Sequence, residues 1–88
     1  MPVVVTLPNA LLNLFPGSQK RVEVTAATVG EMVDALDAHW PGMRDRLCDS
    51  TPRLRRHINV FIDGERASLE TRLAAGARVY VIPAITGG

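Results

Sequence analysis

The stretch Thr28-Val-Gly-Glu-Met-Val-Asp-Ala-Leu-Asp-Ala-His-Trp-Pro-Gly42 is the best-marked element of the chain. Thr28 followed by Glu31 fits a capping box, in which each side chain satisfies a backbone N–H at the start of a helix. Apolar residues then recur at helical spacing: Val29, Met32, Val33, Leu36 and Trp40. The pattern predicts a helix that ends at Pro41-Gly42 and packs one face against a sheet, with Glu31, Asp34 and Asp37 in water.

Segments typical of strands lie on both sides of this helix. Residues 3–7 are rich in β-branched side chains and residues 20–25 alternate polar with apolar, so both predict strands. Residues 58–62 and about 78–82 predict two more, and Asp63-Gly64 after the third indicates a tight turn. The apolar connection over 8–19 indicates a loop packed onto the domain.

Two segments are harder to interpret. Within residues 43–57, Met43 and Leu47 are compatible with a short second helix, after which residues 50–52 favour a loop. Residues 69–76 favour a turn or short helix that anchors Leu69 and Leu73 inward.

Two N-terminal strands, one crossing helix and later strands in 88 residues predict an α+β, ubiquitin-like β-grasp fold. We expect a mixed sheet with the helix across one face and the other face available. The expected division is a β-grasp domain over 1–83 and a flexible C-terminal Gly-Gly tail over 84–88.

Composition narrows the class of protein. The chain is 47% hydrophobic and 22% charged, as in an ordinary globular domain, and its net charge of +1 gives no electrostatic case for nucleic acid. No segment has the pattern of a membrane span or a secretory signal. The single cysteine, Cys48, excludes an internal disulfide. We expect a cytoplasmic protein that is a monomer when free.

The C-terminal residues predict that the terminal carboxylate is the reactive group of the protein. Ile85-Thr86-Gly87-Gly88 follows an apolar strand, and two residues without Cβ make a thin, flexible tip that fits a narrow active site. Fully extended, the stretch from Ala84 to Gly88 would carry the terminal carboxylate about 16 to 18 Å beyond the folded body. A frayed end is the alternative for a bare Gly-Gly.

The segments that carry these features resemble the ThiS/MoaD sulfur-carrier family. Residues 73–88 are similar to its closing motif of a leucine, a glycine turn, a hydrophobic strand, a proline and a terminal Gly-Gly. His57-Ile-Asn-Val-Phe-Ile-Asp-Gly-Glu65 resembles its central strand and turn, and Thr28-Val-Gly-Glu31 resembles its helix start. The long segments before Lys20 and before His57 are more similar to the branch that carries sulfur for cysteine synthesis, the CysO type.

The resemblance implies a protein co-substrate rather than an enzyme. An E1-like adenylyltransferase consumes ATP to adenylate Gly88, and a sulfur donor replaces AMP to leave a thiocarboxylate. The carrier then donates sulfur to a biosynthetic enzyme such as a cysteine synthase, without a bound cofactor or metal. Three alternatives stay open: a MoaD-like small subunit of molybdopterin synthase, a modifier that forms isopeptide bonds through Gly88, and an interaction module with an idle tail.

Other side chains predict partner contacts rather than catalysis. Cys48 has no neighbouring histidine, His39 and His57 lack metal spacing, and Asp34 with Asp37 fits a solvated helix face. The basic residues Arg53, Arg55 and Arg56 form either a solvated loop or a docking site for an acidic partner.

Strand alternation gives the second candidate interface. If Val60 faces the helix, Phe61 and, by the same parity, Tyr80 face the opposite side of the sheet. Together with Ile85 in the tail, they are candidate partner contacts, while Thr86 and Gly87 would line the channel of the activating enzyme. An ordinary half-covered sheet is the alternative.

Overall fold

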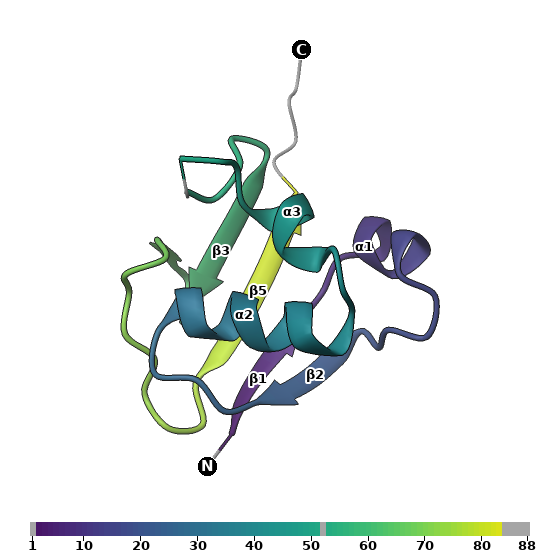
Figure 1. Cartoon of the computed structure of the whole chain (residues 1–88). Helices are drawn as coiled ribbons and strands as arrows, with labels where there is room; N and C mark the ends of the chain where they lie inside the picture. Colours follow the sequence, from purple (N-terminus) through teal and green to yellow (C-terminus); the bar gives the residue numbers. More distant parts are fainter. Residues whose placement is uncertain (1, 52, 84–88) are drawn as a thin grey trace.

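The computed structural model describes residues 2–51 and 53–83. In that part of the chain, five strands and three helices surround one core (Figure 1). The strands are β1 (Val3–Thr6), β2 (Arg21–Val24), β3 (Ile58–Ile62), β4 (Glu65–Ala67) and β5 (Arg78–Pro83). The helices are α1 (Asn9–Leu14), α2 (Val29–His39) and α3 (Met43–Leu47). The mixed sheet with one main helix across it confirms the predicted β-grasp fold.

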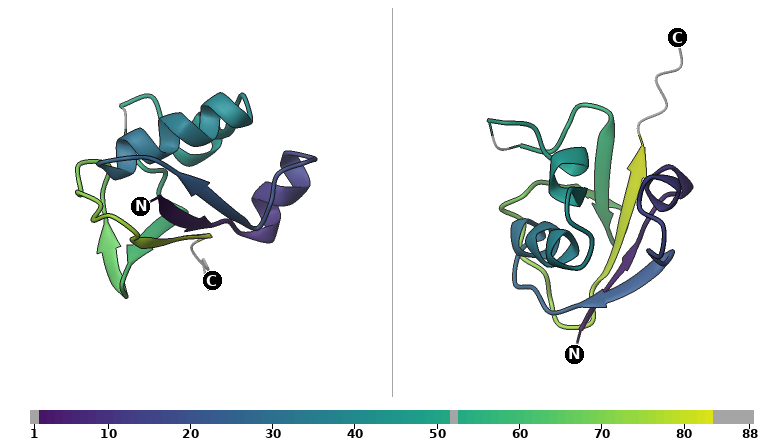
Figure 2. Two further views of the ribbon diagram at one scale, coloured as in Figure 1. Left: turned by 90° about the horizontal axis from the view of Figure 1, so that it is seen from below. Right: turned by 45° about the vertical axis from the view of Figure 1, so that its right-hand side comes forward.

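The strands form one sheet in the order β2-β1-β5-β3-β4. β1 is antiparallel to β2 and parallel to β5, so the first and last strands lie side by side near the centre. A parallel pair requires a long crossover connection, and α2 lies within that connection. Figure 2 shows α2 and α3 on one face of the sheet, while no helix among the described residues covers the opposite face.

The core lies between the sheet and α2. Val5 of β1 and Val79 of β5 are both 0% exposed. The side chains that α2 buries against them are Val29, Met32, Val33 and Leu36. Burying one aliphatic side chain contributes about 1.5 to 3 kcal/mol, so this layer supplies the main stabilisation of the fold.

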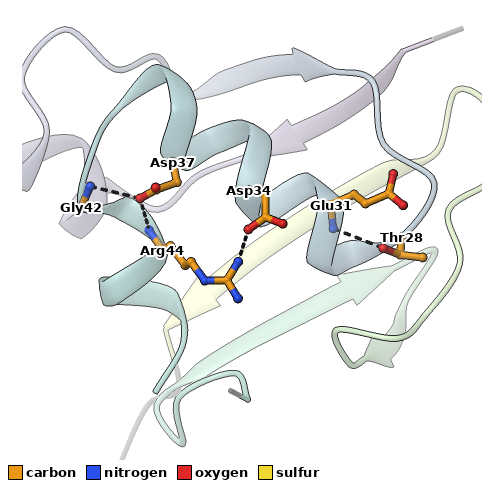
Figure 3. A network of polar contacts seen from close by, with 6 residues as sticks. All are labelled: Thr28, Glu31, Asp34, Asp37, Gly42 and Arg44. Atoms are coloured by element: carbon orange, nitrogen blue, oxygen red, sulfur yellow. Dashed lines mark hydrogen bonds and ion pairs between the residues drawn. The ribbon is translucent and has the colours of Figure 1, made fainter. Parts of the chain in front are cut away.

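Helix α2 begins where the sequence predicts. Thr28 Oγ1 accepts a hydrogen bond from the Glu31 backbone N–H at 3.2 Å (Figure 3). The Glu31 carboxylate accepts from the Ala27 N–H at 3.1 Å, one residue before the position of the standard capping box. Both contacts satisfy backbone donors that the helix start would otherwise leave free.

The turn from α2 to α3 depends on Asp37. Its carboxylate accepts hydrogen bonds from the backbone N–H groups of Gly42 at 3.1 Å and Arg44 at 3.0 Å, and so caps α3 (Figure 3). Gly42 has a φ of 99°, which glycine adopts without strain. The expectation that Asp37 only meets water is therefore wrong. Asp34 is exposed as expected and pairs with the Arg44 guanidinium.

The short helix suggested for the segment after Gly42 is confirmed as α3. Met43 and Leu47 are both 0% exposed and add to the core from the end of α2. Beyond α3, Cys48 forms an isolated antiparallel bridge with Leu54. The bridge closes the 49–53 loop onto the body of the domain.

The connection between β1 and β2 differs in part from the prediction. It packs on the domain as expected, with Leu11 only 4% exposed and Phe15 partly buried. However, it contains the helix α1, whose N-cap is Pro8. Six residues span fewer than two turns, so helical periodicity is too weak there to separate a helix from a packed loop.

The second half of the sheet contains one strand that the sequence did not predict. Asp63 and Gly64 have φ values of 52° and 85°, which confirms the tight turn. This turn folds β4 back onto β3, with Glu65 opposite Ile62. β4 has three residues and only Ala67 is half-buried, so its sequence lacks the alternation of polar and apolar residues that predicts a strand. Leu69 is partly buried and Leu73 is 9% exposed, both inward as predicted.

Within residues 2–51 and 53–83, no helix has the length and apolar character that crossing a bilayer requires.

The two carboxylates of α2 give a matched test of the turn. We expect Asp37→Ala to lower the free energy of unfolding by about 1 kcal/mol, the typical cost of a lost helix cap. Asp34→Ala removes only an exposed ion pair and should cost less than about 0.5 kcal/mol. Chemical denaturation followed by circular dichroism measures both, and equal losses would contradict the capping role.

Candidate functional site

Strand β5 carries the chain toward the predicted functional group. It is paired on both sides, with Thr6 of β1 opposite Tyr80 and with Ile58 of β3 opposite Pro83. Pro83 is the last residue that the structure describes. The predicted site residues Ile85, Thr86, Gly87 and Gly88 lie outside the described residues. What the structure defines is the anchored strand that precedes them.

The face of the sheet opposite α2 carries the aromatic pair that parity predicts. On β5, Val79 and Val81 are 0% and 2% exposed, whereas Tyr80 is 41% exposed. Phe61 of β3 lies directly opposite Tyr80 in the register, so both rings are on the face away from the helix. Val60, next to Phe61, is buried. The parity assignment is confirmed, while the role of the two rings in partner binding stays a prediction.

Polar and charged side chains surround this pair. We call the surface of Phe61, Tyr80 and Ile82, with Arg21, Arg66 and Arg78 around them, the open sheet face. Ile82 is 43% exposed and extends the apolar centre along β5. The register places each arginine on the same face: Arg66 opposite Phe61, Arg78 opposite Val4, and Arg21 opposite Thr6. Glu23, opposite Val4, is the acidic exception.

Such a surface suits protein recognition. Aromatic and aliphatic side chains supply the contact area that a partner buries, and arginine at the margin adds directional hydrogen bonds. Sequence analysis found the two aromatic residues but missed Ile82 and the three arginines. The alternation of β5 also predicts Ile82, but the arginines come from three strands whose register only the sheet defines.

The predicted arginine cluster lies elsewhere, on the loop before β3. Arg55 is held in place: its backbone N–H donates to Leu47 O at 2.9 Å and its Nε to Asp45 O at 2.8 Å. Arg53 and Arg56 are exposed. The structure therefore brings together Arg53, Arg55 and Arg56 as predicted, but not with Phe61 and Tyr80.

Asp49 holds this loop in shape. Its carboxylate accepts hydrogen bonds from the backbone N–H groups of Thr51 at 2.9 Å and Arg53 at 3.0 Å, and from the Thr51 hydroxyl. These contacts stabilise the charged carboxylate, so the hydrogen bonds from Thr51 hold the pKa of Asp49 below its ordinary value. Asp49 thus ties the backbone of Thr51 and of Arg53 to one carboxylate.

The candidate nucleophile, Cys48, lies in the core, whereas His39 and His57 are exposed. Cys48 is 4% exposed, and burial raises the pKa of its thiol, so the thiol is protonated at neutral pH. Within residues 2–51 and 53–83, no three His, Cys, Asp or Glu side chains gather as a ligand set. Asp34 and Asp37 lie on α2, and their carboxylates contact Arg44 and the backbone of the α2–α3 turn.

Comparison with known proteins supplies the family. A model of the ThiS family matches residues 5–88, which include the end of β1 and all of β2 to β5. The chain belongs to the ThiS family. This assignment agrees with the sequence resemblance and with the fold.

Similar proteins of known class indicate the kind of ThiS-family protein to which this chain is related. Sulfur carrier protein CysO of Mycobacterium tuberculosis is 34% identical over 94 residues, which cover 100% of both chains. Small archaeal modifier protein 1 of Haloferax volcanii is 39% identical over 69 residues, or 77% of this chain and 79% of its own. A chain in the crystal structure of the Amycolatopsis orientalis BexX/CysO complex aligns with a TM-score of 0.86 and 32% identity, covering 98% and 99% of the two chains. The class is that of small sulfur carriers and ubiquitin-like modifiers.

The burial of Cys48 has a measurable consequence. We expect iodoacetamide at pH 7.5 to alkylate Cys48 on the order of a hundredfold more slowly in the native protein than in denaturant, because a buried thiol reacts only after local opening. Intact-mass spectrometry over time measures the two rates. Leu14→Cys in a Cys48→Ala background is the control, since position 14 is 51% exposed. Similar native and denatured rates for Cys48 would contradict its burial.

Proposed function

We propose that this ThiS-family chain is a sulfur carrier whose Gly88 carboxylate is adenylated by an E1-like enzyme and then converted to a thiocarboxylate. The observation that carries the proposal is the Gly87-Gly88 sequence that follows β5, in a chain that aligns over its full length with a sulfur carrier protein. The carrier itself contributes the reacting group and the surfaces that partners bind.

Activation is required by the chemistry of the carboxylate. A terminal carboxyl group has a pKa of about 3.3 to 3.7, so at neutral pH it is an anion that resists nucleophiles. In the proposed first step, a carboxylate oxygen of Gly88 attacks the α-phosphorus of ATP and releases pyrophosphate. A sulfur nucleophile then attacks the carbonyl carbon and expels AMP. Gly88 is left with sulfur in place of one oxygen.

The proposed division of labour follows the chain. Residues 1–83 form the body, and residues 84–88 form the tail that enters the activating enzyme. Pairing of β5 with both β1 and β3 fixes the base of this tail, so docking of the body defines where the tail begins. Ile85 would contact the partner, and Thr86 and Gly87 would pass through its channel, where glycine adds no side-chain bulk.

Cysteine synthesis is the acceptor pathway that we propose, with a cysteine synthase taking sulfur from Gly88. Support comes from the full-length similarity to CysO and from the long segments before Lys20 and His57. In this proposal the carrier works in the cytoplasm, as a monomer when free, and ATP is consumed by the activating enzyme.

Protein modification is the second candidate function. It is favoured by the 39% identity to small archaeal modifier protein 1. The same activated Gly88 would then form an isopeptide bond with a lysine of another protein. Because Lys20 is the single lysine, chains of the modifier itself would link through that residue. A thiocarboxylate that disappears with formation of free cysteine supports the carrier, and its loss into a ladder of heavier proteins supports the modifier.

The tail is tested directly by mass. We expect the protein, incubated with ATP, sulfide and its cognate activating enzyme, to gain the mass of one sulfur in place of one oxygen at Gly88. Gly87→Val should reduce this conversion about a hundredfold or more, since a β-branched side chain restricts the backbone and widens the tip.

The control for that experiment is Ala38→Val, which adds similar bulk on the exposed side of α2. It should convert at the wild-type rate. Because Cys48 is buried, alkylation of the native product should label only the new sulfur. Absence of any sulfur-for-oxygen shift in the wild-type protein would overturn the carrier proposal.

The open sheet face is tested by truncating its aromatic pair. We expect Phe61→Ala or Tyr80→Ala to weaken binding to the activating enzyme more than tenfold, because loss of a buried anchor typically costs about 2 kcal/mol. Leu14→Ala is the matched control, since Leu14 is an exposed aliphatic residue on α1. Isothermal titration calorimetry measures the affinity. Unchanged affinity in both aromatic variants would remove the open sheet face from the interface.

A further inference from the structure

A second surface lies at the β3–β4 edge of the sheet, next to the open sheet face, with which it shares Arg66. It is a groove of about 480 Å³ lined by residues 53–56, 58–60 and 66–70, which we call the β3 groove. Its origin is the short length of β4, which pairs with β3 only from Val60 to Ile62. After Ala67 the chain turns away from β3, and Leu69 O accepts a hydrogen bond from the Gly30 N–H at the start of α2. β4 therefore does not cover the beginning of β3, and the groove lies between this part of β3 and the loop that carries Arg53, Arg55 and Arg56.

The floor of the β3 groove is apolar. Leu54, Ile58 and Leu69 are partly buried and pack against the core, and each still presents part of its side chain at the surface. A partly exposed aliphatic floor favours a ligand with an aliphatic side chain, because binding buries apolar surface on both molecules. This feature separates the groove from a merely charged loop.

The rim of the groove is basic. Four arginines line it, Arg53, Arg55, Arg56 and Arg66, against one carboxylate, Glu70. Over residues 2–51 and 53–83 the ion pair of Asp34 with Arg44 is the only one, so none of the four rim arginines forms an ion pair there, although the charge of Arg55 helps to lower the pKa of the Asp49 carboxyl. The chain as a whole carries only +1, which makes this local excess of positive charge distinctive.

In the wall that holds three of these arginines, the backbone of Arg53 and both the backbone and the side chain of Arg55 are hydrogen-bonded to neighbouring residues. Asp49 caps the loop through Thr51 and Arg53, Arg55 is tied to Asp45 O, and the bridge of Cys48 with Leu54 closes the loop. A wall ordered in advance reduces the entropy that binding would otherwise cost.

From this combination we infer that the β3 groove binds an acidic, extended segment of a partner protein, with carboxylates on the arginine rim and an aliphatic side chain on the Leu54–Ile58–Leu69 floor. Charge complementarity selects the acidic residues, and arginine pairs with carboxylates in a bidentate geometry. The floor and Glu70 disfavour a nucleic acid, which is uniformly anionic and offers no aliphatic side chain. The inference goes beyond the proposed function, because it requires neither Gly88 nor its activation.

The test uses the full chain and a synthetic peptide, EDELIDDE, titrated at low salt and followed by two-dimensional NMR. We expect saturable shifts of the Leu54, Ile58 and Leu69 amide signals. The double variant Arg53→Glu/Arg56→Glu should weaken binding about tenfold or more. The matched control, Arg21→Glu/Arg78→Glu, makes the same charge change on the open sheet face and should weaken binding less than about threefold. A peptide with both aliphatic residues replaced by serine should bind about tenfold more weakly.

Several results would overturn the inference. They are absence of saturable binding, equal loss in the two double variants, equal affinity for the serine peptide, or tighter binding of a single-stranded oligonucleotide in the same groove. The thiocarboxylate assay is run on Arg53→Glu/Arg56→Glu in parallel. Normal sulfur loading with lost peptide binding supports a groove that works independently of the tail, and failure of the carrier proposal leaves the peptide result intact.

Discussion

The pairing of β1 with β5 is the constraint on which the rest of the structure depends. It joins the first and last strands in parallel, with Val5 opposite Val79, and both side chains are fully buried. A parallel pair cannot be closed by a tight turn, so the chain between them must cross the sheet, and α2 makes that crossing over the two valines. The same pairing holds the strand that leads to the predicted tail. The β1–β5 pairing therefore stabilises the fold and also positions the start of the proposed functional tail.

The open sheet face is a consequence of this packing. Because side chains alternate along a strand, burying Val79 and Val81 under the helix face directs Tyr80 outward, and burying Val60 does the same for Phe61. A shift of register by one residue would expose the valines and bury the aromatic rings, so the proposed interface cannot move without loss of the core. The packing of the core thus specifies the geometry of the open sheet face.

Charge is distributed unevenly over a chain that is nearly neutral. The exposed side of α2 carries the carboxylates of Glu31 and Asp34, whereas arginines gather on the open sheet face and around the β3 groove. The two basic surfaces adjoin at Arg66, and in our proposals the open sheet face contacts the activating enzyme while the β3 groove binds an acidic segment of another partner. Net charge alone, at +1, conceals this arrangement.

The sequence by itself determined the features that depend on neighbouring residues. The start of α2 at Thr28, the turn at Asp63-Gly64, the outward parity of Phe61 and Tyr80, and the family resemblance all follow from short-range patterns. Tertiary structure decided the rest. α1 and β4 are too short for their periodicity to be read, and Asp37 became a cap because the turn brings Gly42 and Arg44 to its carboxylate. The open sheet face and the β3 groove combine side chains from distant segments, whose proximity is fixed by strand register and not by any local pattern.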